Sequence, residues 1–145
     1  MIIRDLIDED KEQLIEFFHS MDAETNKIFT HFLTQPSKRV ELFMEEDSDK
    51  IIVLMDNKIV GFAFLAKHPD YPGVPSLGLV VRSQYRNKGV GSALMDILFE
   101  IKKEKGYKKI YLSVYKINVK AFNFYKKRGF VVIGEDSERW RMEHE

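Results

Sequence analysis

The residues Arg86-Asn87-Lys88-Gly89-Val90-Gly91 place two glycines and two cations between an apolar run and an amphipathic run. Where a strand passes into a helix, the amides of the first helical turn have no partner within the helix, and the helix dipole adds partial positive charge. Glycines at 89 and 91 let a bulky anion approach these amides, while Arg86 and Lys88 add positive charge nearby. This chemistry favours a bound phosphate group, and a diphosphate in particular.

Several nucleotide-binding motifs use the same backbone chemistry but differ in spacing. The loop lacks the GxxxxGK[ST] phosphate-loop pattern and the third glycine of GxGxxG, so it matches neither motif. A helix start whose glycines serve close packing, with solvated cations, explains these residues equally well. The loop alone leaves both interpretations open.

The elements around the loop form a strand-helix-strand unit. Residues 77–81 (LGLVV) predict a buried strand. Apolar residues then recur at helical spacing, namely Val90, Ala93, Leu94, Ile97, Leu98 and Ile101. Gly106 is placed to end this helix, and residues 108–114 predict a second strand. A helix between two strands favours a parallel pair.

The rest of the chain predicts further strands and helices and one loop. Strands are expected at 1–4, 51–55 and 59–66, and two more around a turn at 135–137. Helices are expected from Asp8 through Phe18, from 22 or 23 to 33 before a break at Pro36, and from Asn118 to Arg128 with Gly129 as its end; residues 39–47 are ambiguous, with a short helix as one interpretation. Three prolines make 68–75 a loop.

Length and composition limit the class of protein. A chain of 145 residues fits one domain, expected over residues 1–145. The 23 basic residues balance 23 acidic ones, so no global positive field favours nucleic acid or an anionic membrane. Without cysteine there is no disulfide framework, and no apolar run suggests a signal peptide or a transmembrane helix. We expect a cytoplasmic protein that binds no nucleic acid and no membrane.

The pattern Arg-x-x-Gly-x-Gly after an apolar strand resembles the acetyl-CoA loop of the GNAT superfamily of N-acetyltransferases. A second family signature, Asn, Ala, Tyr and then Gly-Phe, appears at the expected distance as Asn118, Ala121, Tyr125, Gly129 and Phe130. The two motifs span residues 77 to 130. The resemblance implies an α/β (α+β) fold with a mixed, mostly antiparallel sheet of six to seven strands, a central splayed parallel pair and about four helices.

The resemblance also assigns residues to acetyl-CoA, the implied co-substrate. The pyrophosphate would lie on the backbone N–H groups from Asn87 to Ser92, with Arg86 supplying charge nearby; the residues of this set are Arg86, Asn87, Lys88, Gly89, Val90, Gly91 and Ser92. Pantetheine would pair with Leu79, Val80 and Val81, and an amide near Val80 or Val81 would stabilise the oxyanion. Asn118 would bond the pantetheine amide; an N-cap role alone is the alternative, which the combined motif makes the weaker interpretation. Tyr125 would protonate the leaving thiolate as general acid. The alternative interpretation is a core tyrosine with a purely structural role.

The general base is not identified by the sequence. Family members often carry a glutamate on a central strand, but neither 77–81 nor 111–114 contains a carboxylate. His68 and Asp70 are candidates from the proline-rich loop, although exposed loop residues are the more usual interpretation, and Ser113 could hold a water. A second departure is Ser83, where many relatives have proline. The four histidines show no metal-ligand spacing, so no metal is expected.

These observations favour an N-acetyltransferase that moves acetyl directly from acetyl-CoA to a primary amine: a protein N-terminus or lysine, a polyamine, an aminosugar or another small amine. A noncatalytic acyl-CoA binding or sensing module is the alternative, which the missing carboxylate favours and Tyr125 opposes. A nucleotide hydrolase lacks its motif. Residues 10–50 and 68–75 should determine the acceptor, and edge strands near the C-terminus are compatible with a homodimer.

Overall fold

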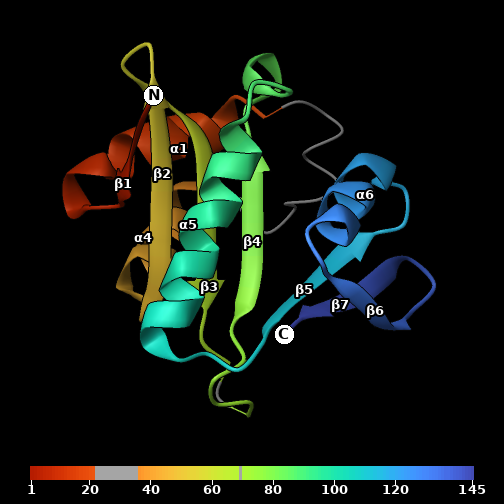
Figure 1. Cartoon of the computed structure of the whole chain (residues 1–145). Coiled ribbons are helices and arrows are strands. Elements are labelled where there is room, and N and C mark those ends of the chain that lie inside the picture. Colours follow the sequence, from red (N-terminus) through yellow and green to blue (C-terminus); the bar gives the residue numbers. More distant parts are fainter. Residues whose placement is uncertain (22–35, 69) are drawn as a thin grey trace.

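The computed structural model describes residues 1–21, 36–68 and 70–145, and these form one seven-stranded sheet (Figure 1). Its strands are β1 (Ile2–Asp5), β2 (Ser48–Met55), β3 (Lys58–Ala66), β4 (Ser76–Val81), β5 (Ile110–Tyr115), β6 (Val131–Glu135) and β7 (Arg139–His144). They lie in the order β1-β2-β3-β4-β5-β7-β6, and all neighbours are antiparallel except β4 and β5. The predicted mixed, mostly antiparallel sheet with a central parallel pair is confirmed.

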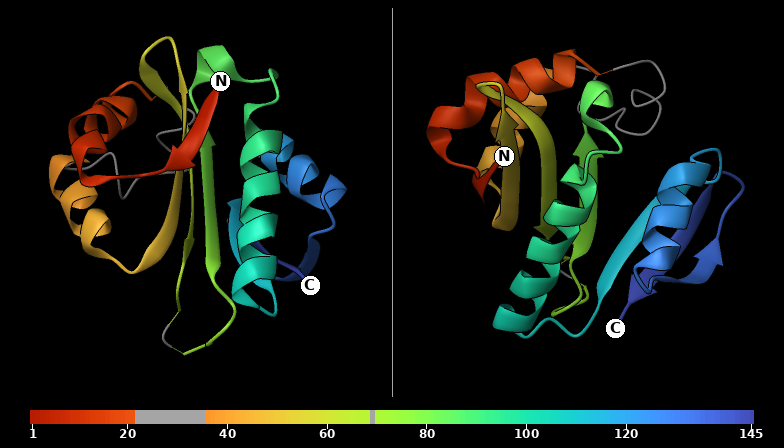
Figure 2. Two further views of the ribbon diagram at one scale, coloured as in Figure 1. Left: turned by 60° about the vertical axis from the view of Figure 1, so that its left-hand side comes forward. Right: turned by 45° about the horizontal axis from the view of Figure 1, so that its top comes forward.

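The helices cover both faces of this sheet. They are α1 (Lys11–His19), α4 (Pro36–Glu45), α5 (Val90–Lys105) and α6 (Val119–Lys127), with short 3-10 turns η1 (Asp8–Asp10) and η2 (Ser83–Tyr85). Figure 2 shows α1 and α4 on one side of the sheet and α5 and α6 on the other. No helix within the described ranges combines the length and the apolar character that a membrane crossing requires.

Each face has its own apolar core. On the α1/α4 face, the buried residues are Leu14, Phe17, Phe18, Met21, Val40, Phe43, Ile52, Ile59, Phe62 and Val80. On the α5/α6 face, strand residues such as Leu112 and Met142 pack with Leu94 and Leu98 of α5 and with Tyr125 of α6. Because strand side chains alternate between faces, β5 and β7 turn their other residues away from α5 and α6. Those residues are Tyr111, Ser113, Tyr115, Arg139, Arg141 and Glu143.

Most predicted boundaries agree with the structure to within a few residues. Gly106 and Gly129 adopt φ of 68° and 95°, the left-handed conformation expected where each glycine ends a helix. Pro36, expected to end a helical region, instead opens α4, because its fixed φ suits a first helical turn. The ambiguous residues 39–47 lie largely in this helix, and β2 begins three residues before the predicted 51. The helix expected from 22 or 23 to 33 lies outside the described residues.

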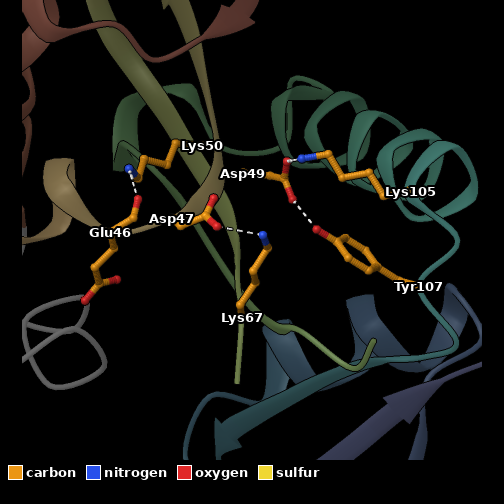
Figure 3. A network of polar contacts seen from close by, with 7 residues as sticks. All are labelled: Glu46, Asp47, Asp49, Lys50, Lys67, Lys105 and Tyr107. Carbon is orange, nitrogen blue, oxygen red and sulfur yellow. Dashed lines mark hydrogen bonds and ion pairs between the residues drawn. The ribbon is translucent and has the colours of Figure 1, made fainter. Parts of the chain in front are cut away.

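A polar network ties the C-terminal end of α5 to β2 (Figure 3). Asp49 on β2 accepts hydrogen bonds from Lys105 and from the Tyr107 hydroxyl, the latter at 2.9 Å. Burial and the Asp49 hydrogen bond raise the pKa of the Tyr107 hydroxyl to about 12. Lys67 pairs with Asp47 at 2.7 Å. Helix, hairpin and the connection into β5 are therefore fixed to one another at this end.

Strand β6 forms one edge of the sheet and exposes apolar side chains. Val131, Val132 and Ile133 are 59%, 43% and 49% exposed. The strand pairs with β7 on one side, and the register shifts between Val132 and Gly134. Its outer backbone edge has no neighbouring strand among the described residues.

Candidate functional site

Strands β4 and β5 are paired at one end and separate towards the other, as Figure 1 shows. Their parallel pairing comprises the single register pair Ser76 and Tyr111. Just before it, the Tyr111 amide donates to the Pro75 carbonyl at 2.9 Å and the Lys108 amide donates to the Gly73 carbonyl at 2.8 Å. Beyond Ser76 the backbone of β4 has no partner strand on this side among the described residues, which leaves a gap between β4 and β5 in the sheet.

The direction of the β4 amides follows from one hydrogen bond. The Arg82 amide donates to the Val60 carbonyl of β3 at 2.8 Å, so Arg82 directs its backbone groups towards β3. Backbone direction alternates along a strand, hence Val80 also faces β3, while Leu79 and Val81 face the gap. Of the three residues expected to contact pantetheine, only Leu79 and Val81 therefore offer backbone amides to a ligand between the strands.

The glycine loop lies beyond the open end of β4 and leads into α5. Asn87 and Gly89 have φ of 61° and 83°, so the chain turns sharply before the helix begins at Val90. Gly89 provides no side-chain cap, and the first amides of a helix have no acceptor within it. The amides at the start of α5, up to Ser92, thus remain donors for an anion.

Close packing does not explain the two loop glycines, because a side chain at either position would have space. A Cβ at Gly89 would meet nothing within 4 Å, and a Cβ at Gly91 would make ordinary contacts of 3.7 Å with Phe124 and 3.9 Å with Leu79. Close packing, the alternative interpretation of the sequence, would predict a clash at one of these positions. The space instead lies open beside the helix amides, and its chemistry fits a phosphate.

The cations of the loop have different surroundings. Arg86 donates from Nε to the Val81 carbonyl at 3.1 Å and so braces the loop against the end of β4. Lys88 places its Nζ 5.4 Å from the centre of the Tyr85 ring, and the Tyr85 hydroxyl donates to Asp56 at 2.5 Å. The loop is therefore attached both to its own strand and to the β2–β3 turn. Ser83, the second departure from the family pattern, lies in η2.

Asn118 caps helix α6 on the other side of the gap. Its side-chain oxygen accepts a hydrogen bond from the Ala121 amide at 3.3 Å. The predicted N-cap role is thus confirmed, and it uses the carbonyl oxygen of the side chain. The amide NH₂ of Asn118 makes no hydrogen bond to any described residue and retains its capacity to donate to a ligand.

Tyr125 lies on helix α6, seven residues after Asn118, and is almost completely buried, with 7% of its surface exposed. Its ring packs edge-on against Phe124 and Phe130, each with centroids 5.6 Å apart. Within the described chain its hydroxyl has no hydrogen-bond partner, and burial raises the pKa of this hydroxyl. Tyr125 is protonated at neutral pH, and no described residue accepts the proton of its hydroxyl.

The candidates for the general base lie in two different places. His68 and Asp70 belong to the β3–β4 connection, where the Asp70 amide donates to His68 Nδ1 at 3.2 Å. His68 lines a cavity of about 360 Å³ with Tyr71 and Tyr107, at the paired end of β4 and β5. That location is away from the open gap and does not suit a base there. Ser113 is exposed on β5, on the face turned away from α5 and α6.

Arg82 is a buried charge that the sequence analysis missed. It is 5% exposed, donates to the Ile59 carbonyl at 2.7 and 3.1 Å, and pairs with Glu16 of α1 at 2.8 and 3.2 Å. The hydrogen bonds from Arg82 lower the pKa of Glu16. Arg82 thereby holds the end of β4, from which the glycine loop departs, against α1. Its partner is 66 residues away, so no local pattern indicates the pair.

Metal ligands are a separate question. Over residues 1–21, 36–68 and 70–145, no group of three or more His, Asp or Glu side chains is arranged to hold a metal ion.

Comparison with known proteins agrees with this geometry. Among curated proteins, the chain is 36% identical over 75 residues to the uncharacterized protein YxbD of Bacillus subtilis (strain 168), covering 52% of this chain and 45% of that protein. It is 28% identical over 95 residues to the streptothricin acetyltransferase of Streptomyces lavendulae, covering 63% and 50% of the two chains. The chain thus spans about half the length of the curated relatives it matches.

Similarity to solved structures extends over the whole chain. The PaiA N-acetyltransferase of Thermoplasma acidophilum, in complex with coenzyme A, superposes with a TM-score of 0.82 at 25% identity and covers 99% of this chain and 98% of that one. A family model described as the Acetyltransferase (GNAT) family matches residues 8–130, which include the glycine loop, Asn118 and Tyr125. The chain therefore belongs to the GNAT acetyltransferase family.

Proposed function

We propose that this protein transfers an acetyl group from acetyl-CoA to an amine, as one N-acetyltransferase domain over residues 1–145. The gap between β4 and β5 is the observation that carries this proposal. It presents the backbone groups of Leu79 and Val81 beside a glycine loop at one side and a protonated, unpartnered Tyr125 at the other. Acetyl-CoA supplies the activated acetyl group; the residues of the chain bind it and move protons.

The donor would be held by backbone more than by side chains. The amides from Asn87 to Ser92 would bind the diphosphate, with Arg86 and Lys88 contributing positive charge. The backbone of Leu79 and Val81 would pair with pantetheine in place of the missing β5 contacts, and Asn118 would donate its NH₂ to the pantetheine amide. An amide of this pair would also stabilise negative charge on the acetyl carbonyl oxygen.

Tyr125 would act as the general acid. The departing thiolate needs a proton, and the Tyr125 hydroxyl carries one at neutral pH, since its ordinary pKa near 10 is raised further by burial. A hydroxyl with no partner in the described chain keeps its proton available for the sulfur.

The acceptor amine must lose a proton before it attacks. An alkylamine with a pKa near 10.4 needs about 4 to 5 kcal/mol to expose its lone pair at pH 7. Neither β4 nor β5 carries a carboxylate for this step, so we propose that water held by Ser113 conducts the proton to solvent. No covalent intermediate on the protein is required, and the chain has no cysteine to form a thioester.

One assay tests the proposal. Purified protein would be incubated with acetyl-CoA and a panel of amines, and release of free thiol would be followed. The panel contains peptide N-termini, lysine peptides, polyamines and aminosugars. Turnover with one class of amine supports the enzyme, whereas binding of acetyl-CoA without thiol release from any amine overturns it.

The second candidate is a noncatalytic acyl-CoA sensor. The absence of a carboxylate on β4 and β5 favours it, since a sensor needs the donor site but no base. It predicts the second outcome of the assay, with acetyl-CoA affinity unchanged by Tyr125→Phe.

We also propose an acceptor class, a cellular location and an assembly for the protein. The streptothricin acetyltransferase relative makes aminated small molecules reasonable members of the panel. We propose a cytoplasmic protein without nucleic-acid or membrane partners, and a homodimer through the β6 edge as its assembly.

A further inference from the structure

A row of residues crosses the sheet at the level where β4 and β5 begin to separate. Strand pairing aligns Phe64 on β3 with Gly78 on β4. Ser76 on β4 pairs with Tyr111 on β5, and the two strands are parallel. Gly78 and Ser113 each lie two residues further along and therefore face one another across the gap. The register then continues from Ser113 to Arg141 on β7 and from Arg141 to Gly134 on β6.

All these residues occupy the face of the sheet opposite α5 and α6. Leu112 and Met142, their neighbours along the strands, pack into the core beneath α5, so Ser113 and Arg141 point the other way. Phe64 packs against Phe43 of α4 on that same face. Because the helices that position the donor loop and Tyr125 cover the first face, an acceptor reaches the gap from the face that carries this row.

The two sides of the row differ in character. On the β4 side, the Phe64 ring covers Gly78, where a Cβ would come within 2.2 Å of the ring. On the β5 side, Ser113 is exposed and Arg141 follows it. An acceptor that crosses the row would meet an aromatic wall on one side of the gap and a polar, cationic surface on the other.

Arg141 differs from its neighbours on the same strand and face because its charge is not matched. Arg139 pairs with Asp136 at 3.5 Å and lies over the Tyr115 ring, while Glu143 pairs with Lys109 at 3.2 Å. Arg141 is half-buried, yet no acidic side chain among the described residues lies within ion-pair distance of it, and it makes no hydrogen bond to them. A guanidinium that is neither paired nor fully solvated is a strong site for a carboxylate or phosphate.

The absence of a side chain at Gly134 leaves space for the Arg141 guanidinium. A Cβ at Gly134 would meet Arg141 Nη2 at 2.4 Å and Cζ at 3.1 Å, so the side chain lies directly over the backbone of β6. The register shift next to Gly134 marks an irregularity in the strand at the same point. A side chain at this position would displace the guanidinium, so the glycine leaves the room in which the donors of Arg141 lie.

We propose that the acceptor amine carries an anionic group at its far end and that Arg141 binds this anion. The inference rests on the proposed acetyl transfer and narrows its acceptor class. Strand β6 is two strand spacings from β5, roughly 10 Å. An acceptor with its amine at the gap therefore holds its carboxylate or phosphate about 8 to 12 Å away, on a flexible or extended chain.

The test uses amines matched in length and differing in charge. Straight-chain ω-amino acids from aminobutyrate to the eight-carbon homologue would be compared with their carboxamides, and an aminoalkyl phosphate with its neutral alcohol. We expect the wild-type protein to prefer the long anionic amines by about 10- to 100-fold in kcat/KM, the effect of one charge-assisted, bidentate contact. A larger ratio in the phosphate arm than in the carboxylate arm identifies phosphate as the preferred anion.

Three variants locate the effect. Arg141→Gln should reduce the preference to about one, whereas Arg139→Gln, on the same strand and face but already paired, should retain it. Gly134→Ala keeps the charge of Arg141 and displaces it, so the preference should fall to an intermediate value. Equal preference in the wild type and in Arg141→Gln overturns the proposal.

A binding measurement separates this inference from the proposed function. Each acid and its carboxamide would be titrated calorimetrically into the protein saturated with coenzyme A. If no amine is acetylated but the acids bind more tightly in an Arg141-dependent way, acetyl transfer fails and the anion site stands. Equal binding of acid and carboxamide overturns the anion site whatever the turnover.

Discussion

The two ends of the β4–α5–β5 unit are built in opposite ways. At the end where α5 finishes, Asp49, Lys105 and Tyr107 satisfy one another, β4 and β5 are paired, and Gly106 closes the helix with hydrogen bonds to Lys102 and Lys103. At the end where α5 begins, Gly89 provides no side-chain cap, the strands are apart, and the Tyr125 hydroxyl has no hydrogen-bond partner in the described part of the chain.

The difference shows how one unit serves both stability and binding. Donors and acceptors that are satisfied within the chain join α5, β2 and the start of β5 at the paired end. Groups left without partners at the other end are then available to a ligand at no cost in competing contacts. Changes at the paired end should therefore affect unfolding, and changes at the open end should affect binding and turnover.

The largest expected effect is that of Tyr125→Phe at the open end. Loss of the general acid should lower kcat by about 100-fold or more, with little change in acetyl-CoA affinity. Steady-state kinetics and calorimetric titration of acetyl-CoA measure the two quantities separately. Unchanged kcat would exclude the general-acid role, and an equal loss of affinity would indicate that the hydroxyl mainly binds the donor.

Asp49→Ala should produce the largest effect at the paired end. It leaves the half-buried Tyr107 hydroxyl without its acceptor and removes the Lys105 pair, and we expect a loss of about 2 kcal/mol in the free energy of unfolding. Asp47→Ala is the matched control, because the Asp47 side chain is 87% exposed and solvent screens its pair with Lys67, so its loss should change the free energy of unfolding much less. Urea denaturation measures both, and similar losses would contradict the distinction.

Two glycines at opposite ends of α5 allow a direct comparison. Gly89 and Gly106 have φ of 83° and 68°, and a Cβ at either would meet nothing within 4 Å. Alanine at each position should cost about 1 kcal/mol of stability through backbone strain. Only Gly89→Ala should weaken acetyl-CoA binding, by about tenfold, because its methyl group would lie in the space assigned to the diphosphate. Equal donor affinities in the two variants would exclude that assignment.

A pH dependence is expected at the paired end, outside the neutral range. The folded state raises the pKa of Tyr107 from its ordinary value of 10 to about 12, so it retains a proton that the unfolded chain has lost. This contribution to stability is present below pH 10 and disappears as the pH rises towards 12. The ultraviolet titration of wild-type protein minus that of Tyr107→Phe should show one tyrosine ionising near pH 12. A midpoint at 10 would show that burial and Asp49 have no effect on it.

Local patterns were sufficient to predict much of the fold and part of the site. Gly106, Gly129 and Asn118 act as predicted because a helix end depends on a few adjacent residues. The donor loop and Tyr125 were assigned through a resemblance that covers residues 77 to 130. The polar start of β2, Ser48 to Lys50, was not predicted as strand, since its pairing with β3 is decided by partners and not by side-chain type.

Contacts between distant segments could not be predicted in this way. The Arg82–Glu16 pair joins α1 to the end of β4, and the Phe64 ring covers Gly78 only because β3 and β4 share a particular register. The alternation in RWRMEH does indicate that Arg139 and Arg141 share a face. It does not indicate that Asp136 neutralises the first and leaves the second unmatched, because that depends on the turn between β6 and β7.

The exposed edge of β6 has a practical consequence for handling the protein. Three consecutive apolar side chains on a strand edge without a neighbour among the described residues favour intermolecular strand pairing in molecules that are not held in the proposed β6 dimer, and a net charge of zero at pH 7 provides no repulsion to oppose it. Colloidal stability should therefore be lowest near neutral pH, where the sequence pI of about 6.9 lies. Storage above pH 8, or a lysine in place of Val132, should keep concentrated samples from precipitating without any change at the donor site.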